Sequence, residues 1–143
     1  MILQGQCTSF KVESYNGYHA FSSAFRAADT FKLALYTSTA ALSYATTVYS
    51  TTNEILGTGY SAGGLVLVPV APAGSGLVAY LSFSPAVWTP ASFTANGGLI
   101  YNSTQGNRAV AVLAFGNDKT PVNNTFTVVF PANGATTSVL RTA

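Results

Sequence analysis

The sequence predicts an all-β protein: an antiparallel β-sandwich or jelly-roll-like barrel with a short N-terminal helix or arm. Three observations favour this fold. Apolar and polar residues alternate in several short runs, as they do in strands that bury one face. Turn-forming residues separate about seven such runs, at intervals of roughly 8 to 14 residues. A chain of 143 residues is also long enough for one domain with an ordinary core.

The N-terminal residues differ in pattern from the rest of the chain. We divide the sequence into residues 1–28, an N-terminal arm or short helix, and residues 29–143, a β-sandwich body, within a single domain overall. Ser9 could cap a short helix and place Glu13 near the favourable N-terminal end of the helix dipole. Asn16-Gly17 argues against a long helix. A short helix and an irregular arm are both compatible with this segment.

The first half of the β body contains one clear strand and one clear hairpin. Residues 31–36 read F-K-L-A-L-Y, which predicts a strand that buries alternate side chains. Residues 37–53 are rich in Ser, Thr and Tyr and show no period, so we expect a loop. Strands at 65–70 and 77–83 should form a hairpin whose connection is residues 71–76, which contain glycine and proline.

Five further strands are expected in the second half, each bounded by turn residues. In chain order they lie at residues 87–94, 99–102, 108–115, 125–130 and 137–141. Pro90 interrupts the first of them. Because proline cannot donate a hydrogen bond to a ladder, this strand should be an edge strand or contain a bulge.

The composition excludes several classes of protein. Charged residues make up 7% of the chain, where a typical soluble domain has about 25%. The six basic residues are scattered along the sequence and form no basic stripe, so we expect no nucleic-acid partner. Cys7 is the single cysteine, which excludes an internal disulfide, and we expect it to be a small buried residue. No apolar run approaches the roughly 20 residues of a membrane span, so we expect no membrane partner. No secretory signal is evident, so we expect synthesis in a cytoplasm.

The sequence predicts no catalytic residues, no cofactor and no bound metal. Residues 57–62 have the letters of a dinucleotide fingerprint, but a strand region with prolines follows where a helix is needed, so we interpret them as a glycine-rich loop. His19 is the only histidine and no nucleophile motif accompanies it, so we expect a structural histidine. A small enzyme that attacks the cell envelope would need a carboxylate, and Glu54→Gln would test that hypothesis first.

Aromatic residues are the remaining candidates for function. Most of them should fill the core, because aromatic side chains favour strands and sandwich interiors. Those in the N-terminal segment and in the loop at 37–53 are candidate protein contacts, since exposed aromatics are good interface anchors. The candidate contact residues are Tyr15, Tyr18, Phe21, Phe25, Tyr44 and Tyr49.

Several strings of the sequence carry a family resemblance. They include T-F-K-L-A-L-Y-T-S at 30–38, G-T-G-Y-S-A-G-G at 57–64, I-Y-N-S at 100–103 and N-R-A-V-A-V-L at 107–113. In order and spacing, from about residue 9 to the C-terminus, the chain resembles a group of small structural, head-associated or decoration-like virion proteins of tailed bacteriophages. The resemblance implies a structural component without catalytic residues.

The sequence and the resemblance together predict a capsid decoration (cement) protein in the virion of a tailed bacteriophage. The resemblance implies that it is made in the cytoplasm of the bacterial host. Its partner would be the major capsid protein or another virion protein, and it would assemble as a homotrimer or other homo-oligomer that gains affinity by multivalency. Neutral hydroxyl-rich surfaces fit this role, because they are desolvated at lower cost than charged ones. The alternative is a tail or fibre component that recognises a host surface glycan by stacking on Tyr44, Tyr49 and Trp88.

Overall fold

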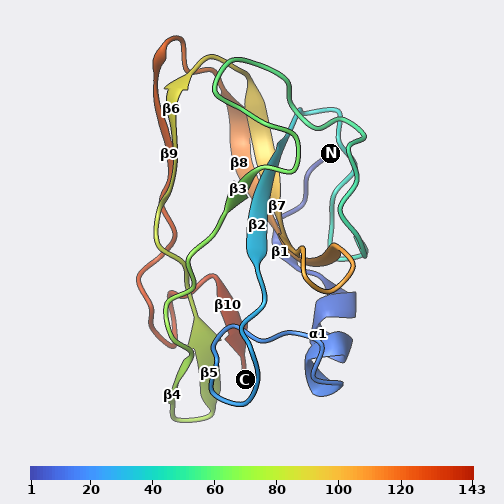
Figure 1. The fold of residues 1–143 in the computed structure, drawn as a ribbon, viewed down its shortest axis with the longest axis vertical. Helices are drawn as coiled ribbons and strands as arrows, with labels where there is room; N and C mark the ends of the chain where they lie inside the picture. Colours follow the sequence, from blue (N-terminus) through green and yellow to red (C-terminus); the bar gives the residue numbers. More distant parts are fainter.

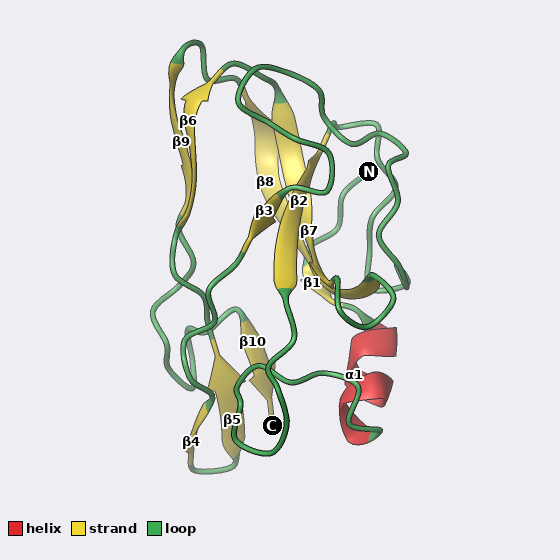
Figure 2. Ribbon diagram, in the orientation of Figure 1, coloured by secondary structure: helices red, strands yellow, loops and turns green.

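The computed structural model describes all residues 1–143, which form antiparallel β-strands and one short helix (Figures 1 and 2). In chain order the elements are β1 (Gly5–Gln6), α1 (Thr8–Tyr15), β2 (Phe31–Tyr36), β3 (Leu65–Val66), β4 (Ala73–Ser75), β5 (Val78–Leu81), β6 (Ala86–Ala91), β7 (Ala95–Asn102), β8 (Arg108–Lys119), β9 (Asn124–Val128) and β10 (Leu140–Thr142). The strands form three sheets, in the orders β1-β8-β7-β2-β3, β10-β5-β4 and β6-β9. The predicted all-β fold with a short N-terminal helix is confirmed.

Strand β2 lies inside the five-stranded sheet and is buried more completely than its alternating pattern predicts. Phe31, Leu33 and Leu35 are buried as expected, but Ala34 and Tyr36 on the opposite face are buried too. The loop at 37–53 covers that second face, and the Tyr36 hydroxyl donates a hydrogen bond to the Ser50 carbonyl at 2.5 Å. Both faces of this sheet are therefore covered.

The predicted hairpin exists, but its connection is shorter than predicted. Residues 71–76 were expected to connect the strands, whereas Ala73–Ser75 is itself strand β4 and pairs with β5 in the register Ser75↔Val78. Gly76 and Leu77 alone form the turn, and Gly76 has a φ of +58°, which two-residue hairpin turns require at their centre. Leu65–Val66 pairs with β2, and the predicted pairing of residues 65–70 with 77–83 is present only around the Pro69–Phe83 bridge.

The strands predicted in the second half of the chain are present, although the last of them begins at Leu140 and not at residue 137. β7 and β8 form the longest ladder and flank the predicted turn at 103–107. β6 pairs with β9 alone, and its register shifts between Trp88 and Ala91, so Pro90 lies in the irregular stretch. The predicted edge strand with a bulge is confirmed.

One hydrophobic core of 29 buried residues joins all three sheets. Within this core the ring of Phe83 lies 6.4 Å from that of Phe31 and 5.4 Å from that of Phe130. Cys7 is fully buried, as predicted, and burial raises the pKa of its thiol to about 11. Gly64 (φ +77°) confirms the glycine-rich loop, because a Cβ there would lie 1.9 Å from the Leu33 carbonyl oxygen.

The N-terminal segment packs into the β body instead of standing off as an arm. β1 pairs with β8, and α1 follows it directly. The predicted cap is wrong: Cys7 occupies the N-cap without a side-chain hydrogen bond, so Ser9 lies inside the helix. Glu13 consequently lies in the last turn of α1, where the helix dipole disfavours a negative charge.

Candidate functional site

Charged side chains from distant parts of the sequence meet beside α1. The carboxylate of Glu13 is buried, and its Oε1 accepts a hydrogen bond from Arg108 Nη1 at 2.6 Å. Its Oε2 lies 2.9 Å from His19 Nε2. These two partners compensate the unfavourable position of Glu13 at the C-terminal end of the helix.

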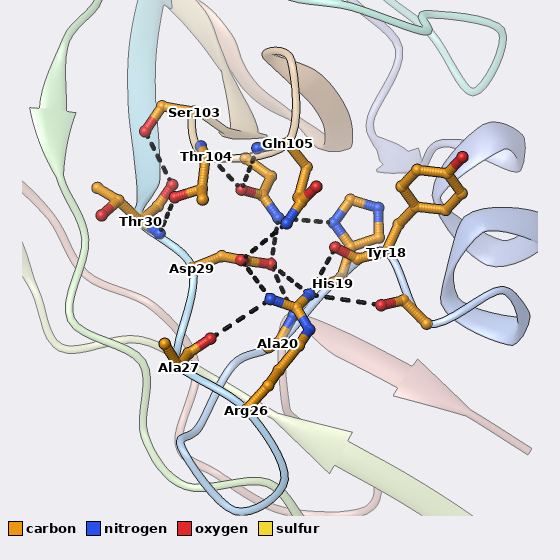
Figure 3. A network of polar contacts seen from close by, with 12 residues as sticks. Tyr18, His19, Ala20, Arg26, Ala27, Asp29, Thr30, Ser103, Thr104 and Gln105 are labelled. Carbon is orange, nitrogen blue, oxygen red and sulfur yellow. Dashed lines mark hydrogen bonds and ion pairs between the residues drawn. The ribbon is translucent and has the colours of Figure 1, made fainter.

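Asp29 is the second buried carboxylate of this network (Figure 3). Arg26 donates to both of its oxygens, at 2.7 and 3.0 Å, and the backbone N–H of Ala20 donates at 2.8 Å. The side-chain amides of Asn102 and Gln105 donate at 2.8 and 3.2 Å. Burial by itself would raise the pKa of Asp29. The hydrogen bonds from Arg26, Asn102 and Ala20 outweigh burial and hold that pKa well below its ordinary value.

His19 joins the two carboxylates into one network. Its side chain is 1% exposed, and its Nδ1 lies 3.0 Å from Asn102 Nδ2. The amide nitrogen of Asn102 can only donate, so His19 Nδ1 accepts and Nε2 carries the proton that is donated to Glu13. Both ring nitrogens of His19 are therefore hydrogen-bonded within the protein.

The network fixes the segment at 16–29 to the turn between β7 and β8. The turn adds two further contacts, because Ser103 Oγ donates to the Thr30 carbonyl and the Thr30 N–H donates to Thr104 Oγ1 (Figure 3). A segment with little regular secondary structure is thus held by charge-assisted hydrogen bonds in place of a ladder.

Three of the predicted contact residues are exposed, Tyr15 at the end of α1 and Tyr18 and Phe25 in the fixed segment, and we call these three residues the aromatic surface. Tyr15 ends α1 and is 87% exposed, and Phe25 is fully exposed in the loop before Arg26. The ring of Tyr18 lies 4.6 Å from the guanidinium carbon of Arg108, a cation–π contact that orients it. A shallow hollow of about 480 Å³ adjoins Tyr18 and is also lined by hydroxyl and amide groups of the β7–β8 turn.

The other three predicted contact residues are placed differently. Phe21 turns inward and stacks on Phe31, with ring centroids 4.2 Å apart and planes 8° from parallel. Tyr49 stacks on Tyr101 at 4.5 Å and is half-buried. Tyr44 is exposed, but its carbonyl accepts from the N–H of Thr8, so it lies at the opposite end of α1 from Tyr15.

The stacking surface expected for a glycan is not assembled. Trp88 is 4% exposed and packs against Tyr60 and Phe126, with ring centroids 6.5 and 5.9 Å away. Because Trp88 lies in the core and Tyr49 packs on Tyr101, Tyr44 is the only exposed ring of the three. The reason is that strand β6 directs Trp88 toward the β-body interior.

Sequence reasoning missed a second polar cluster, around Glu54. Its Oε2 accepts from the Tyr49 hydroxyl at 2.7 Å, and its Oε1 accepts from the Tyr60 hydroxyl at 2.5 Å and from the Gly63 N–H at 2.7 Å. Burial and the hydrogen bond to Glu54 both raise the pKa of Tyr49 and of Tyr60. With three donors on one carboxylate, the cluster ties the loop at 37–53 to the glycine-rich loop.

The chain forms no cluster of metal ligands and has no helix that could span a membrane. At no point do three or more His, Cys, Asp or Glu side chains converge in a way that could hold a metal ion. The single helix, with eight residues, is too short to cross a membrane. Comparison of the chain with protein-family models, curated proteins and solved structures found no match.

Proposed function

We propose that this protein is a structural virion protein of a tailed bacteriophage, a decoration protein that binds the major capsid lattice through its aromatic surface. The observation that carries the proposal is the exposure of Tyr15 and Phe25, on α1 and on a loop that are held by ion pairs to the buried carboxylates of Glu13 and Asp29. The sequence resemblance to small virion proteins supports the same role.

Exposed aromatic rings on a rigid segment suit an interface. A buried aromatic side chain removes at least about 150 Å² from water, which corresponds to about 4 kcal/mol before the costs of association. Because α1 and the ion-pair network already hold the backbone that carries these rings, little further backbone entropy is lost when the rings are covered. A repeated lattice then adds affinity through multivalency.

The distribution of charge supports this role as well. Two of the four acidic residues, Glu13 and Asp29, are buried and paired inside the protein, and Glu54 is half-buried among tyrosine hydroxyls. Few charges are therefore left on the surface to be desolvated when another chain covers it.

The experiment is a binding assay with DNA-free heads of the phage that encodes this chain. We expect the purified protein to saturate the heads, and the double variant Tyr15→Ser with Phe25→Ser to bind at least about tenfold more weakly. Leu77→Ser is the matched control, because Leu77 is 93% exposed in the β4–β5 turn, outside the aromatic surface. Unchanged binding by the double variant, or only a few copies of the chain per virion, would contradict the proposal.

A further inference from the structure

A groove of about 730 Å³ opens between the five-stranded sheet and the strands of the other two sheets. Residues 111–115 of β8 line one side, and residues 126–131 of β9 and the chain after it line the other. Its volume lies within the range of roughly 300–1,000 Å³ typical of ligand sites. The groove shares no residue with the aromatic surface.

Both strands present an edge to this groove. Successive side chains of a strand point to opposite faces of its sheet. Every residue at 111–115 and at 126–131 nevertheless lines the groove, so the groove runs along the edges of these strands. β1 covers β8 only at Ala111 and Val112, and β9 has β6 as its only ladder partner. Beyond β1, the side chain of Gln4 accepts from the Ala114 N–H at 3.2 Å, which substitutes for a strand partner.

About half of the residues that line the groove are hydrophobic, and its charges are of one sign. Leu113, Phe115 and Phe126 are half-buried there, and the two phenylalanine rings lie 6.0 Å apart. The 19 lining residues include Lys119 and Arg141 but no acidic residue.

Neither basic residue is neutralised within the protein. Lys119 Nζ donates to Asn117 Oδ1, Arg141 Nη1 donates to a backbone carbonyl, and neither forms a salt bridge. The neighbouring Asp118 accepts from the Asn96 amide at 2.9 Å and does not line the groove.

The two basic residues lie at opposite ends of the groove. The carbonyl of Arg141 accepts a hydrogen bond from the side chain of Gln6. Gln6 pairs with Ala111, the first residue of β8 that lines the groove. Lys119 is the last residue of β8. At a rise of about 3.3 Å per residue, the strand from Ala111 to Lys119 spans at most about 26 Å.

We propose that this groove binds an extended segment of a different protein chain by β-strand addition. The segment is about eight residues long, with apolar side chains at alternate positions and a carboxylate near each end. Its backbone pairs with the open edges of β8 and β9, its apolar side chains contact Phe115 and Phe126, and its carboxylates face Lys119 and Arg141. A second copy of this chain does not supply such a segment, because its four acidic residues lie at 13, 29, 54 and 118, at least 16 positions apart.

The test uses the purified full-length protein labelled with ¹⁵N and a synthetic peptide of about eight residues, with alternating valine and threonine between terminal aspartates. We expect saturable shifts of the backbone amides of residues 113–115 and 127–130. The same peptide with terminal lysines should bind at least about tenfold more weakly, because like charges meet at both ends.

Two charge reversals test the role of the basic residues. Lys119→Glu and Arg141→Glu should each weaken binding of the aspartate peptide about fivefold, as expected for partly exposed charge pairs. Lys11→Glu is the control, because it changes the net charge equally from an exposed position on α1 outside the groove. If one reversal prevents folding, the other and the salt dependence of wild-type binding still test the charge contribution.

Four results would each overturn the proposal. Two concern the peptides: the absence of a saturable shift at millimolar peptide, and equal binding of the aspartate and lysine peptides. The other two are shifts confined to the aromatic surface and self-association of the protein through residues 113–115. Because the assay contains no virion component, its failure is distinct from failure of the proposed decoration role.

Discussion

Replacing Asp29 with asparagine tests how firmly the ion-pair network holds the N-terminal segment to the β body. The change keeps the shape of the side chain but removes the charge that receives both bonds from Arg26. It also turns an amide NH₂ group toward the donor groups of Asn102 or Arg26, so at least one former hydrogen bond is lost.

The expected loss of folding stability in Asp29→Asn follows from the contacts of this side chain. Hydrogen bonds to charged groups contribute about 1.5–3 kcal/mol each, and breaking a buried ion pair costs about 3–5 kcal/mol. The side chain of Arg26 is 40% exposed, so water recovers part of its loss, and we expect about 3 kcal/mol of destabilisation.

The assay is urea unfolding at neutral pH, with the free energy of unfolding compared at an unchanged m-value. Asp118→Asn is the matched control, because this carboxylate is exposed and accepts one side-chain hydrogen bond, from Asn96. We expect its effect to stay within about 0.5 kcal/mol. If Asp29→Asn were equally mild, the network would not anchor the segment and the reasoning would be refuted.

Three further predictions concern stability. Hydrogen bonds hold the pKa of Asp29 below its ordinary value despite burial, so the contribution of Asp29 to the free energy of unfolding is complete above about pH 4 and is lost as the pH falls further. The free energies of unfolding of wild type and Asp29→Asn should therefore differ less at pH 2 than at pH 5, and a constant difference would argue against this. Phe21→Ala should cost about 3 kcal/mol because its ring stacks on the core, whereas Phe25→Ala should change thermal stability by less than about 0.5 kcal/mol, and equal effects would contradict these placements. Glu54→Gln should cost about 2 kcal/mol in urea unfolding, since the hydroxyl of Tyr49 loses a charged acceptor, and a neutral effect would show that the cluster does not clamp the loops.

Strands with a strong pattern could be predicted from the sequence, and weakly patterned ones could not. The alternation in β2 and the turn between β7 and β8 placed these elements correctly, because burial of one face and turn chemistry are local signals. β4 is exposed along its whole length and reads A-G-S, so no apolar pattern marked it as a strand. The same lack of pattern made the hairpin connection look longer than it is.

The site was predictable in part. Exposed aromatics in the N-terminal segment were expected from composition, but nothing in the sequence separates the inward Phe21 from the outward Phe25. The ion pairs were out of reach, because Glu13 and Arg108 are 95 residues apart and Asp29 and Asn102 are 73 apart. Charges that look scattered along the chain converge in space, and only the fold brings them together.

Cryo-microscopy of the virion is the most direct test of the central claim, that the aromatic surface binds a capsid lattice. The proposal predicts density for this chain repeated over the head, with Tyr15, Tyr18 and Phe25 against the major capsid protein. Density confined to the tail, or head density in which these three side chains face solvent, would contradict it.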